Sequence, residues 1–299
     1  PEITAQPIGR VVYADSNVSL SVTAEGKYLS YQWKKDGSNL TGETNATLNI
    51  TDANATLHDG NYSVVVSNDF GSVESGVVEM LLSTWSPTSV LGLELWLDST
   101  DVSTFDLSSS SIIQWSDKSG KGNHFTQSNT SLRPSLNNGT VTFAHGQNLL
   151  CVNTIQQSSL NFIYVKKSTD NKSIDFSANS GLFATVFQEN QGMSGEFANR
   201  SYFKNGASVN LSSRHDAYAE FHNGLKNIIA ETNRNTSSWP GFGIANYGGW
   251  EYEGEYSEFI FISGQLSNAD RQKTEGYLAH KWGLSADLPT DHPYKNNAP

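Results

Sequence analysis

Cysteine is almost absent from this chain. Cys151 is the only one among 299 residues, so no disulfide can form within it. It lies in the apolar run Leu149-Leu-Cys-Val152, which predicts a buried, unreactive thiol. No apolar run approaches the roughly 20 residues of a membrane span, and we expect no membrane insertion. The chain opens at Pro1 with a strand-like segment and no secretory signal, so we expect it to be part of a longer protein.

Basic residues are also scarce. Lys and Arg number 19 against 30 Asp and Glu, which gives a net charge of −11 and a pI near 5.0. Nucleic acid binding needs clustered Lys and Arg to displace phosphate counterions, and no such cluster occurs, so we expect no nucleic acid partner. The acidity favours solubility in a salty or extracellular medium, with cation affinity at loop sites as the alternative.

Long uninterrupted apolar segments are missing, yet 36% of the residues are hydrophobic and 11% aromatic. This content suffices for packed cores and is too high for a disordered chain. The apolar residues form short runs separated by Asn, Ser, Thr and Gly, a pattern typical of many short strands. A length of 299 residues allows one small and one large domain.

The first 83 residues show the alternation of half-buried strands, most clearly in Val18-Ser-Leu-Ser-Val22 and Tyr62-Ser-Val-Val-Val66. Trp33 lies in a further strand-like segment that ends at the turn pair Asp36-Gly37. This segment resembles an immunoglobulin-like domain of the intermediate set, with Trp33 at the core tryptophan and Tyr62 at the tyrosine corner.

The resemblance departs from the family pattern at two positions, because Val22 and Val64 stand where the core cysteines would be. The missing bridge forfeits about 2–4 kcal/mol. Two valines packed on Trp33 recover part of this, roughly 1.5–3 kcal/mol each. Disulfide-free versions of this fold are common in bacterial surface and secreted proteins, so the resemblance implies a spacer or presenter.

Residues 84–89 predict a linker, because the segment is polar and contains Pro87, which breaks the strand pattern. Residues 90–299 form the predicted second domain. Its Asn-Gly pairs are hairpin signals, at Asn138-Gly139, Asn205-Gly206 and Asn223-Gly224. A helix is predicted from about Asn268 to Trp282, capped by Ser267 and ended by Gly283. Many antiparallel strands with one late helix indicate a two-sheet sandwich.

The ends of this second domain carry four recognisable segments: Leu95-Trp-Leu-Asp-Ser-Thr-Asp101, Gln114-Trp-Ser-Asp-Lys-Ser-Gly120, Glu275-Gly-Tyr-Leu-Ala-His-Lys-Trp-Gly-Leu284 and Leu288-Pro-Thr-Asp-His-Pro-Tyr-Lys295. In this order they resemble the bacterial laminin-G-like, concanavalin A-like jelly-roll family. The expected fold is therefore all-β: an immunoglobulin-like sandwich followed by a concanavalin A-like jelly roll with one short C-terminal helix.

An acidic stretch, Trp250-Glu-Tyr-Glu-Gly-Glu-Tyr-Ser-Glu258, is the sharpest enzymatic candidate. On a strand, Glu251, Glu253 and Glu255 would point to one face. A retaining glycosidase needs two carboxyl groups only about 5–5.5 Å apart. However, jelly-roll glycosidases resemble Glu-x-Asp-x-x-Glu, whose middle aspartate is missing here, and Gly254 interrupts the strand. We favour a solvated or hairpin-stabilising acidic face over catalysis or ligand binding.

Calcium is a possible cofactor, because many laminin-G-like relatives hold Ca²⁺ with Asp carboxylates. Asp98, Asp101, Asp106 and Asp117 lie near the motif loops. No Asp-x-Asp-x-Asp-Gly loop is present. Asp117 equally fits a turn in which its carboxylate accepts backbone N–H groups, and we favour the turn.

Sugar binding needs an aromatic face for the pyranose and polar groups for its hydroxyls. The Gly-rich stretch from residue 237 to 250 offers both, and the candidate ligand-binding residues are Trp239, Asn246, Tyr247 and Trp250. The alternative is that Trp239 and Trp250 plug the core, since tryptophans are highly buried on average. Trp96, Trp115 and Trp282 sit at apolar motif positions and are expected in the core.

Other chemical motifs are missing: no zinc pattern, phosphate-binding loop, dinucleotide fingerprint or Gly-x-Ser-x-Gly elbow occurs. His215, Asp216 and His222 are close in sequence and are expected on a hairpin surface.

The sequence thus predicts a non-catalytic carbohydrate-binding or adhesion fragment of a larger secreted, cell-surface or virion protein. The expected partner is a polysaccharide or cell-surface glycan, besides other domains of the parent protein. This rests on fold analogy, since one fold hosts many functions. A purely structural or protein-interaction module, such as part of an adhesin or phage structural protein, is the first alternative. A divergent glycoside hydrolase or polysaccharide lyase is the second.

Overall fold

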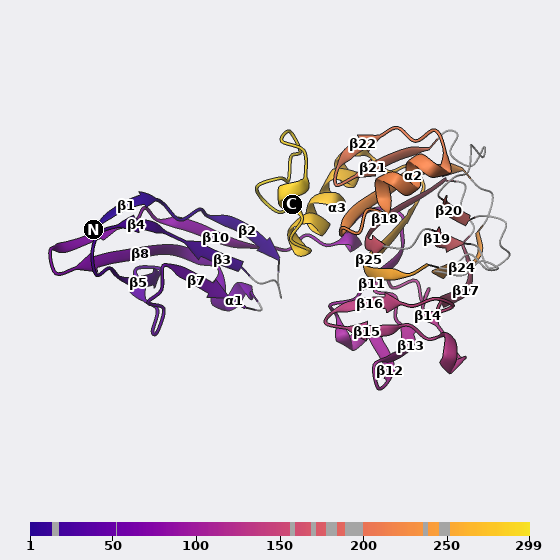
Figure 1. Cartoon of the computed structure of the whole chain (residues 1–299), viewed down its shortest axis with the longest axis horizontal. Helices are drawn as coiled ribbons and strands as arrows, with labels where there is room; N and C mark the ends of the chain where they lie inside the picture. The colour runs from indigo at the N-terminus through magenta and orange to yellow at the C-terminus, as the bar shows by residue number, and fades with distance from the viewer. Residues whose placement is uncertain are drawn as a thin grey trace. The chain divides into compact units, whose positions relative to one another are not determined.

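The computed structural model describes residues 1–13, 18–51, 53–155, 159–168, 172–177, 184–188, 200–235, 239–244 and 252–299. The chain divides into two compact units (Figure 1). Unit 1 comprises Pro1–Trp85 together with His280–Ser285 and Pro293–Pro299. Unit 2 comprises Ser86–Ala279 and Ala286–His292. Strands dominate both units, so the all-β prediction is confirmed.

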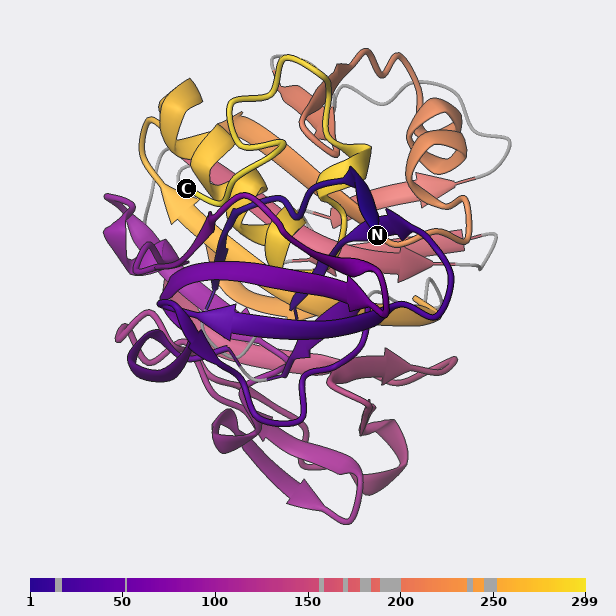
Figure 2. The same ribbon diagram turned by 90° about the vertical axis from the view of Figure 1, so that its left-hand side faces the viewer.

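Unit 1 contains short strands arranged in two layers (Figure 2). One layer has the order β2-β10-β8-β5-β6, with β9 also paired to β8, and β2 runs parallel to β10. The other layer consists of the pairs β1–β4 and β3–β7. The bounds are β1 Glu2–Ala5, β2 Arg10–Tyr13, β3 Val18–Ser21, β4 Thr23–Glu25, β5 Ser30–Lys35, β6 Ser38–Asn39, β7 Thr47–Ile50, α1 Ala55–His58, β8 Gly60–Asn68, β9 Gly71–Glu74 and β10 Val78–Ser83.

The core of unit 1 is built around Trp33, which is fully buried and donates its indole N–H to the Asn45 carbonyl at 2.9 Å. Val22 and Val64 are buried in the same cluster, so both predicted substitutes for the cysteines lie in the core. Tyr62 is buried and donates its hydroxyl to the His58 carbonyl at 2.9 Å. The predicted tyrosine corner is therefore present, and apolar packing replaces the disulfide.

The remaining elements follow from residue 87 onward. Helical segments are η1 Pro87–Ser89, η2 Val102–Thr104, η3 Thr130–Leu132, α2 Arg214–Phe221, α3 Asn268–Lys281 and η5 Ser285–Asp287. Strands are β11 Leu93–Asp98, β12 Phe105–Ser108, β13 Ser111–Trp115, β14 Phe125–Thr126, β15 Ser135–Asn137, β16 Thr140–Phe143, β17 Leu149–Ile155, β18 Ser159–Ser168, β19 Lys172–Ser177, β20 Ala184–Gln188, β21 Ser201–Lys204, β22 Ala207–Val209, β23 Asn227–Asn235, β24 Trp239–Ile244 and β25 Gly254–Ser263.

The strands of unit 2 form one continuous order, β20-β19-β24-β17-β14-β13-β15-β16-β25-β18-β23-β21-β22, with β11 on β25 and β12 on β13. Strands from both halves of this order bury side chains in one core. Trp115 on β13 and Leu149 on β17 belong to the same cluster as Phe162 on β18 and Phe259 on β25. A sheet that buries one shared face in this way is folded over itself as a two-layer sandwich.

Helix α3 matches its prediction closely. Ser267 accepts the N–H of Asp270 at 3.0 Å, as an N-cap does, and Gly283 follows the helix with a positive φ of 71°. Its Tyr277 donates to the carboxylate of Glu258 on β25 at 2.7 Å. Trp96 on β11 donates to the same oxygen, also at 2.7 Å. Two of the recognisable sequence segments therefore meet at one buried carboxylate.

The burial of three tryptophans and of Cys151 can be compared with what the sequence predicts. Trp96 and Trp115 are buried as predicted, whereas Trp282 is only partly buried. Cys151 is buried, and burial raises the pKa of its thiol, which agrees with the predicted unreactive side chain.

Two Asn-Gly pairs form the predicted hairpins, between β15 and β16 and between β21 and β22. The hairpin at Asn223-Gly224 was wrong, because helix α2 precedes it. Ser213 caps that helix by accepting the N–H of Asp216 at 3.1 Å. Asn223 then accepts the N–H of Leu225 at 3.0 Å, a local turn that leads into β23.

Candidate functional site

The predicted sugar-binding segment lies mostly outside the described residues. Trp239 opens β24, where its backbone pairs with Ile155. Asn246, Tyr247 and Trp250 are not among the described residues. The role of these four residues therefore stays a prediction.

The acidic stretch is not one continuous strand face. Glu251 lies outside the described residues, and β25 begins only at Gly254. A Cβ atom at Gly254 would lie 2.3 Å from the Lys167 carbonyl oxygen and 2.7 Å from the Tyr252 hydroxyl. Tyr252 in turn approaches the carbonyl oxygens of Lys167 and Glu255 at 2.9 and 3.0 Å. The break at Gly254 was predicted, and it separates Glu253 from the strand that carries Glu255.

Five charged or titratable side chains surround the start of β25, and we call them the charged row: His145, Lys167, Lys226, Glu253 and Glu255. Lys167 on β18 pairs in register with Glu255, and their charged groups lie 3.5 Å apart. Glu253 precedes β25, and its carboxylate lies 3.4 Å from His145 in the turn after β16. The row therefore extends across three neighbouring strands.

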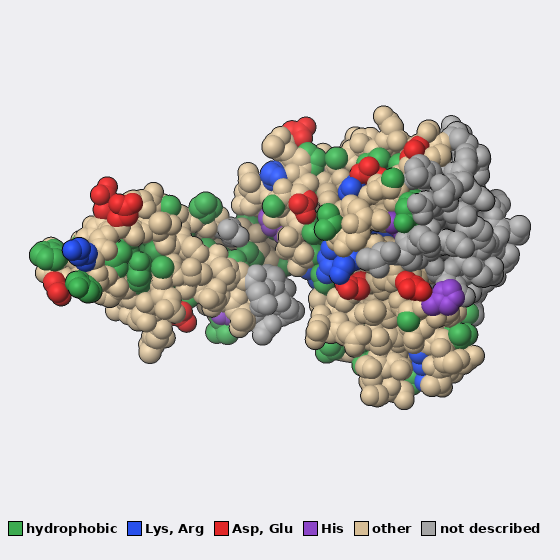
Figure 3. All heavy atoms as spheres, in the orientation of Figure 1, with side chains coloured by type: hydrophobic (Ala, Val, Ile, Leu, Met, Phe, Trp, Pro, Cys, Tyr) green, Lys and Arg blue, Asp and Glu red, His purple; other side chains and the backbone are tan. Residues whose placement is uncertain are grey.

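The charged row is open to solvent at both of its close contacts. The side chains of His145 and Glu253 are 76% and 50% exposed, and those of Lys167 and Glu255 are 40% and 34% exposed. Burial lowers the pKa of Lys226, as does the Lys167 ammonium, against the opposing effect of the Glu255 carboxylate. Figure 3 shows acidic, basic and histidine side chains close together on one face of unit 2. Hydrogen-bond donors and acceptors therefore alternate on this surface.

Sequence reasoning singled out Glu253 and Glu255 but missed their partners. Lys167 ends a long apolar run and His145 follows a hairpin strand, and each is unremarkable in sequence. The one available signal was Lys166-Lys167 at the end of the run Phe162–Val165, since a strand buried on both faces rarely ends on two lysines by packing alone. Strand register brings the row together.

The candidate calcium ligands are occupied by protein groups. The Lys118 ammonium lies 3.0 Å from Asp98 and 2.7 Å from Asp101, where a cation would be. Burial alone would lower the pKa of Lys118, but these two carboxylates outweigh it and raise that pKa. Asp106 is exposed on β12. Among the residues that the structure describes, no three His, Cys, Asp or Glu are placed to hold a metal ion.

Asp117 forms the turn that the sequence favoured. Its two carboxylate oxygens accept the backbone N–H groups of Trp96, Ser119 and Asn123 at 3.0, 2.8 and 3.0 Å. The Ser119 hydroxyl donates to it as well, at 2.7 Å. With four donors on one carboxylate, Asp117 is used to shape the loop rather than to bind a cation.

His222 is not on a hairpin surface, which corrects the prediction. It is buried at the end of α2, where its ring nitrogens lie 2.9 Å from Lys166 Nζ and 3.0 Å from Ser168 Oγ. The helix carries the ring inward onto β18. Lys166 and Ser168 therefore occupy both ring nitrogens, and the donor and acceptor roles depend on the ring tautomer.

Unit 1 exposes two aromatic rings that sequence reasoning did not single out. Tyr28, in the β4–β5 connection, is 86% exposed, and Phe70, in the β8–β9 turn, is 89% exposed. The sequence signal was an aromatic residue inside Asn68-Asp-Phe-Gly71, where small polar residues are usual.

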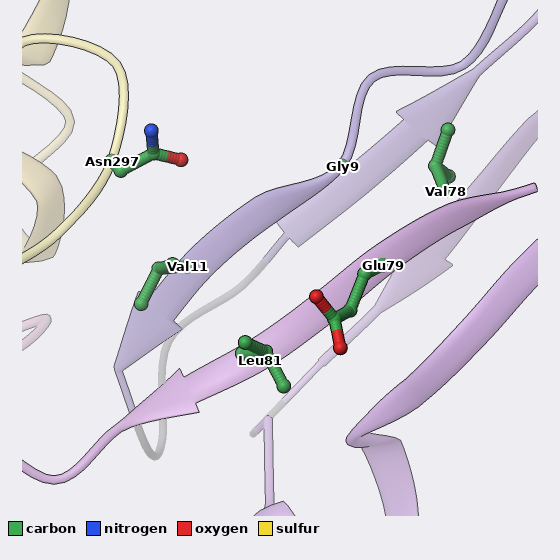
Figure 4. A pocket seen from close by; sticks show the side chains of 6 residues that line it. All are labelled: Gly9, Val11, Val78, Glu79, Leu81 and Asn297. Atoms are coloured by element: carbon green, nitrogen blue, oxygen red, sulfur yellow. The ribbon is translucent and has the colours of Figure 1, made fainter.

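A small hollow also lies in unit 1, against β2 and β10 (Figure 4). Val11, Leu81 and Val78 contribute apolar walls, and the Glu79 side chain points outward beside them. With mostly aliphatic walls, one carboxylate and the amide of Asn297, the hollow offers few groups that could orient a ligand.

A sequence model of the immunoglobulin domain matches residues 1–68. The N-terminal domain is therefore immunoglobulin-like, as predicted. No curated protein sequence matches the chain. None of the helices in the described parts of the chain has the length and apolar character of a membrane span.

Several solved structures are similar in part. The N-terminal Ig1-2 module of the Drosophila receptor protein tyrosine phosphatase DLAR shares 20% identity, with 28% of this chain and 48% of that one covered and a TM-score of 0.26. Rst D1-D2 shares 11% identity, with 89% of this chain and 99% of that one covered and a TM-score of 0.25. The titin domain I81 shares 12% identity, with 27% of this chain and 95% of that one covered and a TM-score of 0.21. The chain spans about half the length of the DLAR structures. Scores this low add nothing on function.

Proposed function

We propose that the chain is a non-catalytic recognition fragment of a larger secreted, cell-surface or virion protein. In this proposal unit 2 is a concanavalin A-like jelly roll that binds a polysaccharide or cell-surface glycan, and the immunoglobulin-like domain presents it. Support comes from the motif resemblance and from the two-layer antiparallel sandwich in which two motif segments meet at Glu258.

The charged row is the observation that carries the proposal. Sugar hydroxyls both donate and accept hydrogen bonds, and the row offers carboxylates beside ammonium and imidazole groups on an exposed surface. One of the predicted aromatic residues is close in sequence, because Trp250 precedes Glu253 by three residues. Covalent geometry limits their Cα separation to about 11 Å. Aromatic stacking and polar contacts would then act on one ligand.

The geometry argues against a glycosidase. The acid of such an enzyme is kept protonated by an apolar pocket. Glu253 is half exposed beside His145, and Glu255 lies opposite Lys167. These surroundings suit ion pairing and ligand contact, not general acid catalysis.

The buried chain Ser168–His222–Lys166 does not form a hydrolytic triad. A triad needs a carboxylate on the histidine to stabilise the imidazolium. Here Lys166 and Ser168 occupy the two ring nitrogens of His222, and Ser168 has no exposed surface. We assign the chain to holding α2 against β18.

The test is affinity electrophoresis of the whole chain through soluble polysaccharides together with a glycan array, each run with Ca²⁺ and with chelator. Glu253→Gln and Lys167→Met are expected to weaken binding by about tenfold or more, as loss of a charged hydrogen bond does. Trp239→Ala and Trp250→Ala test the predicted stacking. Asp287→Asn, which changes an exposed carboxylate in η5 of unit 2, is the control and should bind like the unmodified chain.

Three outcomes would redirect the proposal. Absence of binding to both neutral and charged glycans would indicate a structural or protein-interaction module instead. Binding that ignores the charged row would move the site elsewhere in unit 2. Cleavage of a polysaccharide that vanishes in Glu253→Gln would establish an enzyme.

A further inference from the structure

The end of the immunoglobulin-like domain that carries Tyr28 and Phe70 forms a second candidate surface, in a different unit from the charged row. We call it the aromatic tip and define it as Glu2, Glu25, Lys27, Tyr28, Asp69 and Phe70. All six side chains are exposed. Single exposed rings need no explanation, but two on adjacent turns form a patch.

The two turns of the aromatic tip are tied together. The side-chain amide of Asn68, at the end of β8, donates to the Lys27 carbonyl oxygen at 3.2 Å. Its oxygen accepts the N–H of Phe70 at 2.9 Å. One asparagine therefore fixes both turns, and the rings are presented on a preorganised backbone. Preorganisation reduces the ordering cost of binding.

Tyr28 adopts a conformation that folding alone would not select. Its φ is 55°, in the left-handed region, where a non-glycine residue costs roughly 1–2 kcal/mol. Its ring is 86% exposed, so almost none of its apolar surface contributes to the core. Glycine would suit this backbone better. The Tyr28 side chain is thus presented to solvent and adds little to the packing of unit 1.

Charge points to the kind of partner. Glu2 on β1 and Glu25 on β4 lie directly opposite each other, and like charges in that arrangement are destabilising. Asp69 adds a third carboxylate beside the rings, against the single ammonium of Lys27. A cationic group that docks here would relieve the repulsion and stack on an aromatic ring.

We infer that the aromatic tip is a docking surface for a partner protein that presents Lys or Arg beside an apolar side chain. The cation would be drawn to the facing carboxylates of Glu2 and Glu25 while the apolar side chain packs on Tyr28 and Phe70. This inference does not depend on glycan binding by unit 2.

The test uses the whole chain and a set of short immobilised peptides of defined sequence. The peptides combine Lys or Arg with Leu or Phe, and two control sets replace the basic residues by Glu or the apolar ones by Ser. Binding is measured by interferometry at several salt concentrations. The basic, apolar peptides are expected to bind, more weakly as salt rises.

Tyr28→Ala and Phe70→Ala should each weaken this binding by about tenfold or more, as truncation of an interface aromatic does. Both rings are exposed, so the variants should keep the thermal transition of the unmodified chain. Leu57→Ala is the matched control, because Leu57 is 65% exposed on α1 of the same unit. Its binding should be unchanged.

Several results would overturn the inference. They are the absence of binding to every peptide, equal binding in the Tyr28→Ala, Phe70→Ala double variant, and preference for the acidic peptides. Glycan binding lost in Phe70→Ala would make the tip a sugar site instead. A dimer in sedimentation that Phe70→Ala dissolves would identify a second copy as the occupant. Glycan binding sensitive only to Glu253→Gln concerns unit 2 and leaves the peptide result to decide.

Discussion

The two units bury polar groups in different ways. In the core of unit 1, Trp33 and Tyr62 each donate to a backbone carbonyl, at Asn45 and His58, within an otherwise apolar cluster. Unit 2 also buries charged side chains, and these contact other side chains. Glu258, Lys166, Glu231, Arg234 and Glu275 are all 2% exposed or less.

This difference has consequences for stability. A backbone carbonyl that loses one donor keeps part of its hydrogen bonding. An apolar core tolerates the exchange of side chains of similar volume, as the two valines in place of cysteines illustrate. A buried charge that loses its partner leaves a desolvated group behind, with a penalty of about 3–5 kcal/mol. Single substitutions should therefore have graded effects in unit 1 and large effects in unit 2.

Glu258→Ala should have the largest effect. It removes the common acceptor of Trp96 and Tyr277, leaves two buried donors without it and opens a cavity between β11, β25 and α3. We expect a loss of about 3–5 kcal/mol in the unfolding of unit 2, measured by calorimetry of the whole chain.

Glu255→Ala, on the same strand but 34% exposed, is the control and should change stability by less than about 1 kcal/mol. Equal losses in the two variants would break the contrast drawn between buried and exposed charge.

Sequence patterns predicted unit 1 well because its information is local. Alternation placed Val18, Leu20 and Val22 on one strand face, and all three are buried. The Asp36-Gly37 turn joins β5 to β6 as expected. Apolar periodicity and turn chemistry act over a few residues, so they can be read without knowing the fold.

The polar interior of unit 2 could not be predicted in the same way. Trp96 and Glu258 are 162 residues apart and meet only through the pairing of β11 with β25. His222 looked like a surface residue because helix α2 was missed. The charged row also depends on strand register, since Lys167 on β18 lies opposite Glu255 on the neighbouring β25. The segment with the predicted aromatic ligands lies mostly outside the described residues, so that part of the site stays a prediction.

Gly254→Ala should be second in size. Its φ of 151° disfavours a side chain, and the added Cβ would clash with the Lys167 carbonyl oxygen at 2.3 Å. A backbone atom in a paired strand cannot move aside cheaply, so we expect a loss of about 2–4 kcal/mol in unit 2.

Gly26→Ala in unit 1 provides the comparison. Its φ is similar, 144°, but the nearest atom is Cδ2 of Leu29 at 2.9 Å, the end of a flexible side chain. Its loss should be smaller, within about 1–2 kcal/mol. Denaturant unfolding of both variants tests this, and a greater loss at Gly26 would contradict the rigidity assigned to unit 2.

Tyr62→Phe should have a moderate effect in unit 1. It removes the hydroxyl that donates to the His58 carbonyl, for a loss of about 1 kcal/mol. It should also change the pH dependence. Burial, with the Asp36 and Asp59 carboxylates, raises the pKa of Tyr62 to about 12.

The sign follows from proton linkage. The unfolded tyrosine releases its proton from about pH 10, while the folded one keeps it until about pH 12, so stability falls as pH rises through that window. Tyr62→Phe should flatten this fall in a denaturation series from pH 9 to 12. A slope that survives in Tyr62→Phe would assign it to another group.

Tyr28→Gly should have the smallest effect and the opposite sign. Glycine removes the penalty of the left-handed conformation, which stabilises the fold by about 1–2 kcal/mol. Its greater backbone freedom in the unfolded chain lowers the stability by about 0.5–1 kcal/mol. The expected net gain is about 0.5–1 kcal/mol, or roughly 2–8 °C in the transition of unit 1. Asn138→Gly is the matched control in unit 2, because Asn138 has a φ of 48° and asparagine tolerates that region. Its transition should hardly move.

A rise in stability combined with loss of peptide binding would show that unit 1 gives up folding energy to present a ring. A fall would mean that Tyr28 supports the fold, and the case for the aromatic tip would then rest on Phe70 alone.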